Sequence, residues 1–210
     1  MKPGKLSLIA LLLAFVFILL SLMPTSGESG IYGRMIRLHI LAESDSEADQ
    51  TVKLLVRDRI LEIAEAYENS GELTASAGIA EAKSFVEEHL GELKDAATDV
   101  LRANGSQSEV TVTLSEEYYE TRKYDGFSLP AGRYLSLRIL IGKAEGKNWW
   151  CVLYPPLCIS SAKVSAKDKL KTAGFTPDQI GFITESNNPG YRIRFRIVEL
   201  LGELKNLLFP

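Results

Sequence analysis

The chain has 210 residues, with 24 Lys and Arg against 27 Asp and Glu, and a formal net charge of −3. Acidic and basic residues are mixed throughout, which argues against a nucleic-acid-binding protein. The sequence has no internal repeat and no low-complexity tract.

The N-terminal segment has the pattern of an export signal. Lys2 and Lys5 precede an uncharged apolar run over residues 6–23. This pattern is typical of secretory signals, yet a run of about 18 residues is also just long enough to span a bilayer as a helix. We therefore expect residues 1–27 to be a signal peptide or an uncleaved membrane anchor, residues 28–33 to be a linker, and the rest of the chain to lie outside the cytoplasm.

Residues 34–210 are long enough for one domain with a hydrophobic core. Alternating apolar residues predict a first strand over residues 34–41, buried on one side. A helix should follow, with Ser44 as its N-cap in a capping box with Glu47. A second long helix is expected from about Ile79 to Leu101.

The C-terminal half is predicted to be richer in strands. Alternation indicates strands over residues 110–114, 133–141 and 149–154. Residues 159–190 are interpreted as a long loop, with a short helix near Pro177. A strand over residues 191–197 should then merge into a C-terminal amphipathic helix. The expected fold is α+β, a single exported domain with a largely antiparallel sheet covered by two long helices and the C-terminal helix.

Both cysteines lie in one short segment, at Cys151 and Cys158. An even pair outside the cytoplasm favours a disulfide over a redox or zinc site. If the chain stayed extended, the sulfurs would lie roughly 20 Å apart, so Pro155 and Pro156 must reverse the chain for a bridge to form. Two buried free thiols are the alternative. With only His39 and His89 as histidines, we expect no metal site and no cofactor.

No residue pattern indicates catalysis. His39 lies on the strand face opposite Ile36, Leu38 and Ile40, where a surface or hydrogen-bonded histidine is expected rather than a base. The sequence has no Gly-x-Ser-x-Gly motif, and Cys151 has no base near it in sequence.

Partner contact is the other role available to these residues. Trp149 and Trp150 must point to opposite faces of a strand. One of them is therefore a candidate interface anchor, unless helices cover both faces. His39 and the row Arg192, Arg194 and Arg196 are further candidate contacts.

Several ordered motifs resemble the stage II sporulation protein R family. They are Arg37-Leu-His-Ile-Leu-Ala-Glu-Ser-Asp-Ser, Leu54-Leu-Val-Arg-Asp58, Pro130-Ala-Gly-Arg-Tyr134 and Asn148-Trp-Trp-Cys-Val-Leu-Tyr-Pro-Pro-Leu-Cys158. The resemblance covers residues 34–158, and the C-terminal segment fits more loosely. Glu43 departs from the pattern, since an asparagine is expected there.

The resemblance implies a function that composition does not show. Proteins of this family are exported across the forespore membrane into the space between the forespore and mother-cell membranes. There they activate a membrane-embedded aspartic protease that processes pro-sigma-E factor in the mother cell. This chain would then be an intercellular signal and not an enzyme, secreted or associated with the membrane through residues 6–23. A secreted hydrolase using His39 and a passive cell-envelope scaffold are the alternatives.

Overall fold

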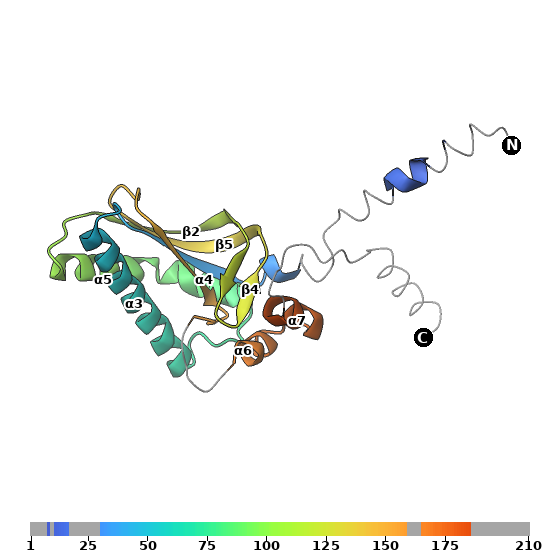
Figure 1. The fold of residues 1–210 in the computed structure, drawn as a ribbon. Coiled ribbons are helices and arrows are strands. Elements are labelled where there is room, and N and C mark those ends of the chain that lie inside the picture. Colours follow the sequence, from blue (N-terminus) through green and yellow to red (C-terminus); the bar gives the residue numbers. More distant parts are fainter. Residues whose placement is uncertain (1–7, 9–10, 17–29, 159–164, 186–210) are drawn as a thin grey trace.

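A computed structural model of the chain describes residues 8, 11–16, 30–158 and 165–185. Most of the apolar run, and the strand and helix expected after residue 190, lie outside these residues. Figure 1 shows the arrangement of the elements. In chain order they are β1 (Ile36–Leu41), α3 (Glu47–Ser70), α4 (Ile79–Glu88), α5 (Leu90–Ala103), β2 (Val110–Tyr119), β3 (Arg122–Tyr124), β4 (Phe127–Leu129), β5 (Gly132–Ile141), β6 (Asn148–Tyr154), α6 (Ala166–Thr172) and α7 (Pro177–Glu185).

The main sheet has four strands in the order β2-β5-β1-β6. The two outer pairs, β2–β5 and β1–β6, are antiparallel. The central pair, β1–β5, is parallel. A parallel pair needs a long crossover, and the three helices between β1 and β2 are part of the connection from β1 to β5. The α+β class and a largely antiparallel sheet are confirmed; the parallel centre was not predicted.

The first long helix is confirmed, with a different cap. Ser46, not Ser44, is the N-cap of α3, and its side chain accepts a hydrogen bond from the backbone N–H of Asp49. Ser44 instead accepts one from the backbone N–H of Ser46 and donates one to the Asp49 carboxylate. The helix ends at Gly71, whose φ of 82° is a left-handed conformation that favours glycine.

The single second helix predicted from Ile79 to Leu101 is wrong, because the chain breaks at His89 into α4 and α5. The His89 ring stacks on Phe85 at 4.0 Å between centroids, and its Nδ1 lies 2.7 Å from the Phe85 carbonyl oxygen. This local bonding ends α4. The apolar stripe nevertheless continues through the break, since Val86 and Leu93 are both buried.

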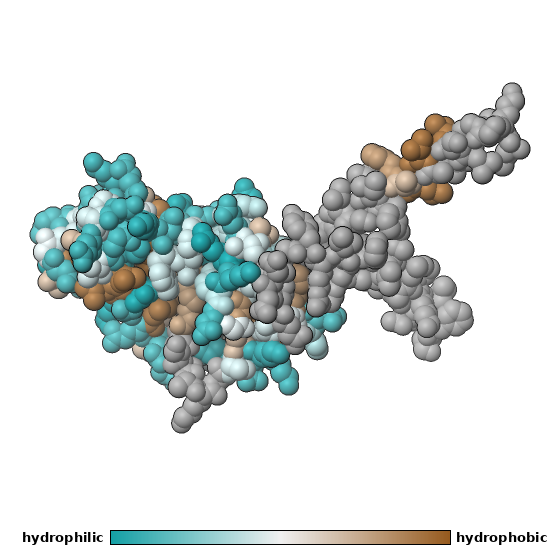
Figure 2. Space-filling model, in the orientation of Figure 1, coloured by the Kyte–Doolittle hydropathy of each residue, from teal (hydrophilic) through white to brown (hydrophobic). Residues whose placement is uncertain are grey.

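The helices cover one face of the sheet, and the main core lies between them. It joins alternate residues of the central strands to the inner stripes of α3, α4 and α5, among them Leu38, Ile40, Val56, Ile60, Ala97, Leu101, Leu137, Ile139 and Leu153. Apolar residues also reach the surface of α3 at Leu54 and Leu55, and Figure 2 shows a hydrophobic area on the side where α3 lies.

The opposite face is partly covered too, contrary to the prediction that β1 is buried on one side only. A second cluster packs there, formed by Ile31, Met35, Tyr119, Phe127, Leu129, Tyr134, Val152, Leu170, Phe175 and Ile183. It draws on the β3–β4 hairpin and on α6 and α7. The hairpin and α6 were not predicted, whereas the short helix beginning at Pro177 is confirmed.

Cys151 and Cys158 are joined in a disulfide, with Cα atoms 6.2 Å apart. Pro155 and Pro156 lie in the reversal between them, and Lys169 of α6 donates a hydrogen bond from Nζ to the Pro156 carbonyl at 2.7 Å. The bridge therefore ties the middle of β6 to the reversal that follows the strand.

We predict that unreduced protein isolated from its native compartment is lighter by two hydrogens than the reduced form. Replacing both Cys151 and Cys158 by serine should lower the free energy of unfolding by about 2 kcal/mol, because so short a loop restricts the unfolded chain only modestly. Mass spectrometry and urea unfolding measure the two effects. Two freely alkylated thiols in native protein would reject the bridge.

Candidate functional site

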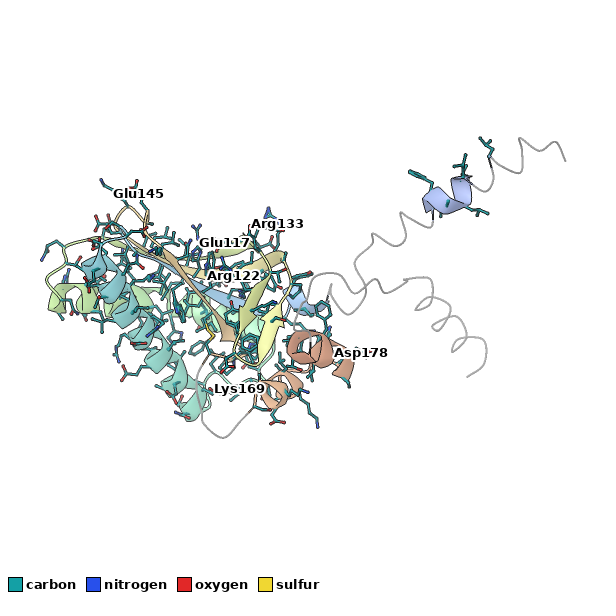
Figure 3. The ribbon with its side chains drawn as sticks, viewed as in Figure 1. Glu117, Arg122, Arg133, Glu145, Lys169 and Asp178 are labelled. Atoms are coloured by element: carbon teal, nitrogen blue, oxygen red, sulfur yellow. A yellow bond between two sulfur atoms is a disulfide. The ribbon has the colours of Figure 1, made fainter. Side chains whose placement is uncertain are left out.

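A polar network lies on the sheet face turned away from α3 and α5. Strand alternation places seven side chains on this face: Arg37, His39, Glu117, Tyr119, Ser136, Arg138 and Trp150. They come from all four strands, and Arg122 of β3 reaches the same group. Figure 3 labels Glu117 and Arg122. We call these eight residues together with Asn148 the polar face network.

His39 is at the centre of the network and only 3 % exposed. Its Nδ1 lies 3.0 Å from each carboxylate oxygen of Glu117, and its Nε2 lies 2.7 Å from Asn148 Oδ1. Glu117 also accepts a hydrogen bond from Ser136 Oγ at 3.0 Å, and the hydroxyl groups of Ser136 and Tyr119 are 2.6 Å apart. The expected hydrogen-bonded histidine is confirmed, but it is buried and not at the surface.

The Trp150 ring contacts both the His39 ring and the Arg122 guanidinium group. It stacks on His39 with centroids 3.5 Å apart, and the Arg122 guanidinium carbon lies 4.9 Å from the Trp150 ring. Tyr119 meets it edge-on at 4.8 Å. The predicted opposite orientation of the tryptophans is confirmed, since Trp149 packs against the helix-side core with the Arg57 guanidinium carbon 5.4 Å from its ring.

Arg37 is fully buried, with aromatic rings close to its charge. Its guanidinium carbon lies 4.1 Å from the Tyr119 ring centroid, 5.0 Å from that of Tyr134 and 5.7 Å from that of Tyr124. Its Nε donates to the Cys151 carbonyl oxygen at 3.3 Å, and its Nη2 donates to the Tyr124 hydroxyl. Burial raises the pKa of all three tyrosines, so they remain neutral and the cation is stabilised by ring faces.

The contacts of His39 differ from those of a Ser-His-acid hydrolase. A Ser-His-acid hydrolase needs a hydroxyl on the histidine nitrogen that faces away from the carboxylate. Here that nitrogen of His39 meets Asn148, while the Ser136 hydroxyl donates to Glu117. Across the described ranges, no group of three or more His, Cys, Asp and Glu could hold a metal ion.

Three arginines of the network each retain a buried donor without a hydrogen-bond partner among the described residues: Arg37 Nη1, Arg122 Nε and Arg138 Nε. Arg138 Nε lies 3.5 Å from Glu117 Oε1, and its side chain is about one-third exposed, at 34 %. The unpaired Nε atoms are themselves buried, so only the exposed part of the Arg138 side chain can meet a group from outside.

The structure brings some of the predicted residues together and separates others. His39 and Trp150 are in contact, whereas Trp149 lies on the other face. Arg192, Arg194 and Arg196 lie outside the described residues. Sequence reasoning missed Arg37, Glu117, Asn148 and Arg122, although strand alternation around His39 is a signal that could have pointed to Arg37.

The fold and this network define an α+β protein with a mixed sheet, one face of which carries a buried polar cluster. Comparison with known proteins identifies the family. The sequence model described as "Stage II sporulation protein R (spore_II_R)" matches residues 33–164, and the chain belongs to this family.

A curated relative supports the assignment. Stage II sporulation protein R of Bacillus subtilis (strain 168) is 29% identical over 189 residues, with 80% of each chain covered. No solved structure matches the chain significantly. Membership of the family supports a role in sporulation signalling. No helix in the described part is long and apolar enough to cross a membrane.

The polar face network should make stability depend on pH. Burial, the largest effect, lowers the pKa of His39 below its usual 6.5, against the opposing hydrogen bonds of Asn148 and Glu117. The unfolded chain therefore binds a proton more readily than the folded protein. The contribution of His39 to stability is complete above about pH 6.5 and is lost as the pH falls toward the lowered value.

We expect wild-type protein to lose more unfolding free energy between pH 7 and pH 5 than the His39→Gln variant does. Urea unfolding at several pH values measures the difference, in which the titration of other groups largely cancels. Equal pH dependence of the two proteins would show that His39 does not titrate differently on folding.

Proposed function

We propose that this protein is an exported signal that activates the membrane-embedded aspartic protease responsible for processing pro-sigma-E factor in the mother cell. The family match over residues 33–164 carries the proposal, because this activation is what membership of the family implies. The site of action is the space between the forespore and mother-cell membranes.

The sequence and the fold support export in different ways. Lys2, Lys5 and the uncharged residues 6–23 have the pattern of a signal or anchor. The disulfide between Cys151 and Cys158 suits an oxidising compartment. Ile31, inside the expected linker of residues 28–33, is buried in the second cluster, so the folded part includes the end of that linker.

The proposed role is binding and not catalysis. An activator must bind the active state of its target more tightly than the inactive state. His39 is fully engaged by Glu117 and Asn148 and carries no adjacent nucleophile among its described contacts. The Trp150 and Arg122 side of the network, where a guanidinium lies near a partly exposed indole ring, is the candidate contact surface.

The decisive experiment reconstitutes processing in a host that does not sporulate. The full chain, the candidate protease and its pro-sigma-E substrate are produced together, with export of the chain retained. We expect shortened sigma factor only when all three are present. Processing that is equally efficient without this chain would reject activation, and a passive scaffold predicts that result.

Export is tested by topology. We expect a reporter that is active only outside the cytoplasm to be active when fused after Gly33, because positive residues before the apolar run keep the N-terminus inside. A matched fusion in which residues 6–23 are deleted should be inactive. Activity of a cytoplasmic reporter fused at Gly33 would reject the intercellular route.

The contact surface is tested with the two tryptophans. We expect Trp150→Ala to lower processing by at least about tenfold, as truncation of an interface anchor does, while Trp149→Ala lowers stability with little effect on processing per folded molecule. Trp150→Phe retains an aromatic ring over His39 and should recover part of the activity. Circular dichroism establishes the folded fraction of each variant. Full activity of folded Trp150→Ala would move the contact surface elsewhere.

The alternative to a binding role is that the protein is a hydrolase with His39 as a catalytic residue. We expect His39→Ala to abolish no chemical step, and the purified domain to hydrolyse no peptide. Hydrolysis by wild-type protein that is lost in a folded His39→Ala variant would overturn the binding role.

A further inference from the structure

β2 forms one edge of the sheet, and no described strand pairs with its outer side. It is the outermost strand, next to β5 (Figure 1), and it pairs with β5 over 10 consecutive residues without a register shift. Natural edge strands are commonly shortened, bulged or protected by Pro or Lys. Val110–Tyr119 has none of these features. The strand therefore presents a long row of backbone groups to a further strand.

The backbone groups that point outward from this edge belong to the even-numbered residues. The Gly142 N–H donates to the Glu109 carbonyl oxygen at 2.8 Å, on the register that pairs Val110 with Ile141. Backbone groups of an antiparallel strand point alternately to its two sides. The odd-numbered residues of β2 therefore bond to β5, and the even-numbered residues direct their N–H and C=O groups away from the sheet.

The helix side of this edge carries an exposed aromatic ring near one end and a recess near the other. Strand alternation puts the even-numbered side chains on this side, where Val112 and Leu114 pack against the main core. Tyr118, near the end of β2, is 61 % exposed. At the start of the strand, a recess of about 310 Å³ opens beside Val110. Its wall from α5 consists of Lys94, Thr98, Leu101 and Arg102.

The ring and the recess lie at equal distances from the middle of the strand. Tyr118 is four residues after Leu114, and Val110 is four residues before it. A two-fold axis at Leu114 therefore places Tyr118 of one copy opposite Val110 of another copy, beside the recess. Because the axis relates both copies, each recess receives a tyrosine ring. This self-complementarity is what an isologous dimer requires.

We propose that two copies of this protein pair antiparallel through β2, joining two sheets of four strands into one continuous sheet. Leu114 of one copy pairs with Leu114 of the other. Val112 pairs with Glu116, and Val110 pairs with Tyr118. These are all even-numbered residues, so their outward N–H and C=O groups exchange hydrogen bonds across the axis.

Charge supports the same pairing. Glu116 of one copy lies opposite Val112 of the other on the helix side, close to the recess. Lys94 and Arg102 give the recess two cations against one carboxylate, that of Glu109. Opposite charges therefore approach one another at both ends of the interface, which favours this partner and this register.

The neighbouring register is less favourable. A two-fold axis at Thr113 would place Glu109 of one copy directly opposite Glu117 of the other. Like charges in directly opposite positions destabilise a pair of strands. The axis at Leu114 instead places Glu117 opposite the Thr111 hydroxyl group, and no two acidic residues face each other.

The register predicts a cross-link between two copies of a single-cysteine variant. Leu114 faces its own counterpart in a hydrogen-bonded pair, whose Cα atoms lie about 5.5 Å apart, a distance that a disulfide spans. We expect full-length Leu114→Cys protein, produced with export retained, to form a disulfide-linked dimer under mild oxidation. Because Cys151 and Cys158 are bonded to each other, the added thiol is the free one in each chain.

Val112→Cys is the matched control, on the same side of the same strand. Its two thiols would lie roughly 13 Å apart along the strands, so it should link far less than Leu114→Cys does. Equal linking of both variants would indicate collision without a register and would overturn the proposal. The absence of linked dimer in folded Leu114→Cys protein, with folding measured by circular dichroism, would overturn it as well.

The contact of the tyrosine with the recess is tested in the Leu114→Cys background. We expect Tyr118→Ala to slow linking at least about fivefold, as truncation of an interface anchor does. Tyr118→Phe keeps the ring in the recess and should link nearly as fast as the parent. Unchanged linking in Tyr118→Ala would reject this register.

Hydrogen exchange tests the pairing without an added cysteine. In the full-length chain, the outward amides of Val112, Leu114 and Glu116 should exchange at least about tenfold more slowly at high protein concentration than at low concentration, because the dimer forms by mass action. The amides of Thr113 and Ser115, which donate to β5, should change little. Outward amides that exchange as fast as unprotected amides at both concentrations would reject the dimer. None of these tests depends on protease activation.

Discussion

The burial of β1 on both faces is the constraint on which the rest of the structure depends. Its apolar residues face the helices, and its other face buries Arg37 and His39 in the middle of the sheet. Desolvating a charged or polar side chain is costly unless its donors and acceptors are satisfied. The elements around β1 must therefore supply polar and aromatic partners as well as apolar packing.

Those partners come from distant parts of the chain. β2 supplies Glu117 to His39, β6 supplies Asn148 and Trp150, and the β3–β4 hairpin supplies Tyr124 to Arg37. The arginine interacts with neutral tyrosine rings instead of a carboxylate, which leaves Glu117 to the histidine and to Arg138. The two buried groups thus determine how the hairpin and the sheet edges are placed.

The same arrangement accounts for the second layer of the molecule. The β3–β4 hairpin, α6 and α7 cover the Arg37 end of this face, and Arg122 of β3 extends over Trp150. At the other end, Asn148 and Thr113 are exposed among the described residues. A contact surface there would be held rigidly by the network beneath it, and rigid anchors bind with a smaller loss of conformational entropy than mobile ones. A buried polar network in which the Ser136 hydroxyl donates to Glu117 and not to His39 is consistent with the proposed binding role.

Much of the architecture could be predicted from the sequence, because it depends on local periodicity. Alternation identified the strands at β1, β5 and β6, the helical stripe identified α3, and turn residues bounded them. The break at His89 and the choice of Ser46 as N-cap were missed, since both follow from competing local hydrogen bonds. The hairpin and α6 are too short to show a period.

The sequence by itself determined the α+β class, the apolar N-terminal run, the spacing of Cys151 and Cys158, and the opposite orientation of the tryptophans. Only the tertiary structure decided that β1 lies parallel to β5 and that His39, Glu117 and Asn148 meet. Periodicity specifies which face a side chain takes, but pairing order and register decide its neighbours. Glu117 and Asn148 lie 78 and 109 residues from His39, so no local pattern could join them.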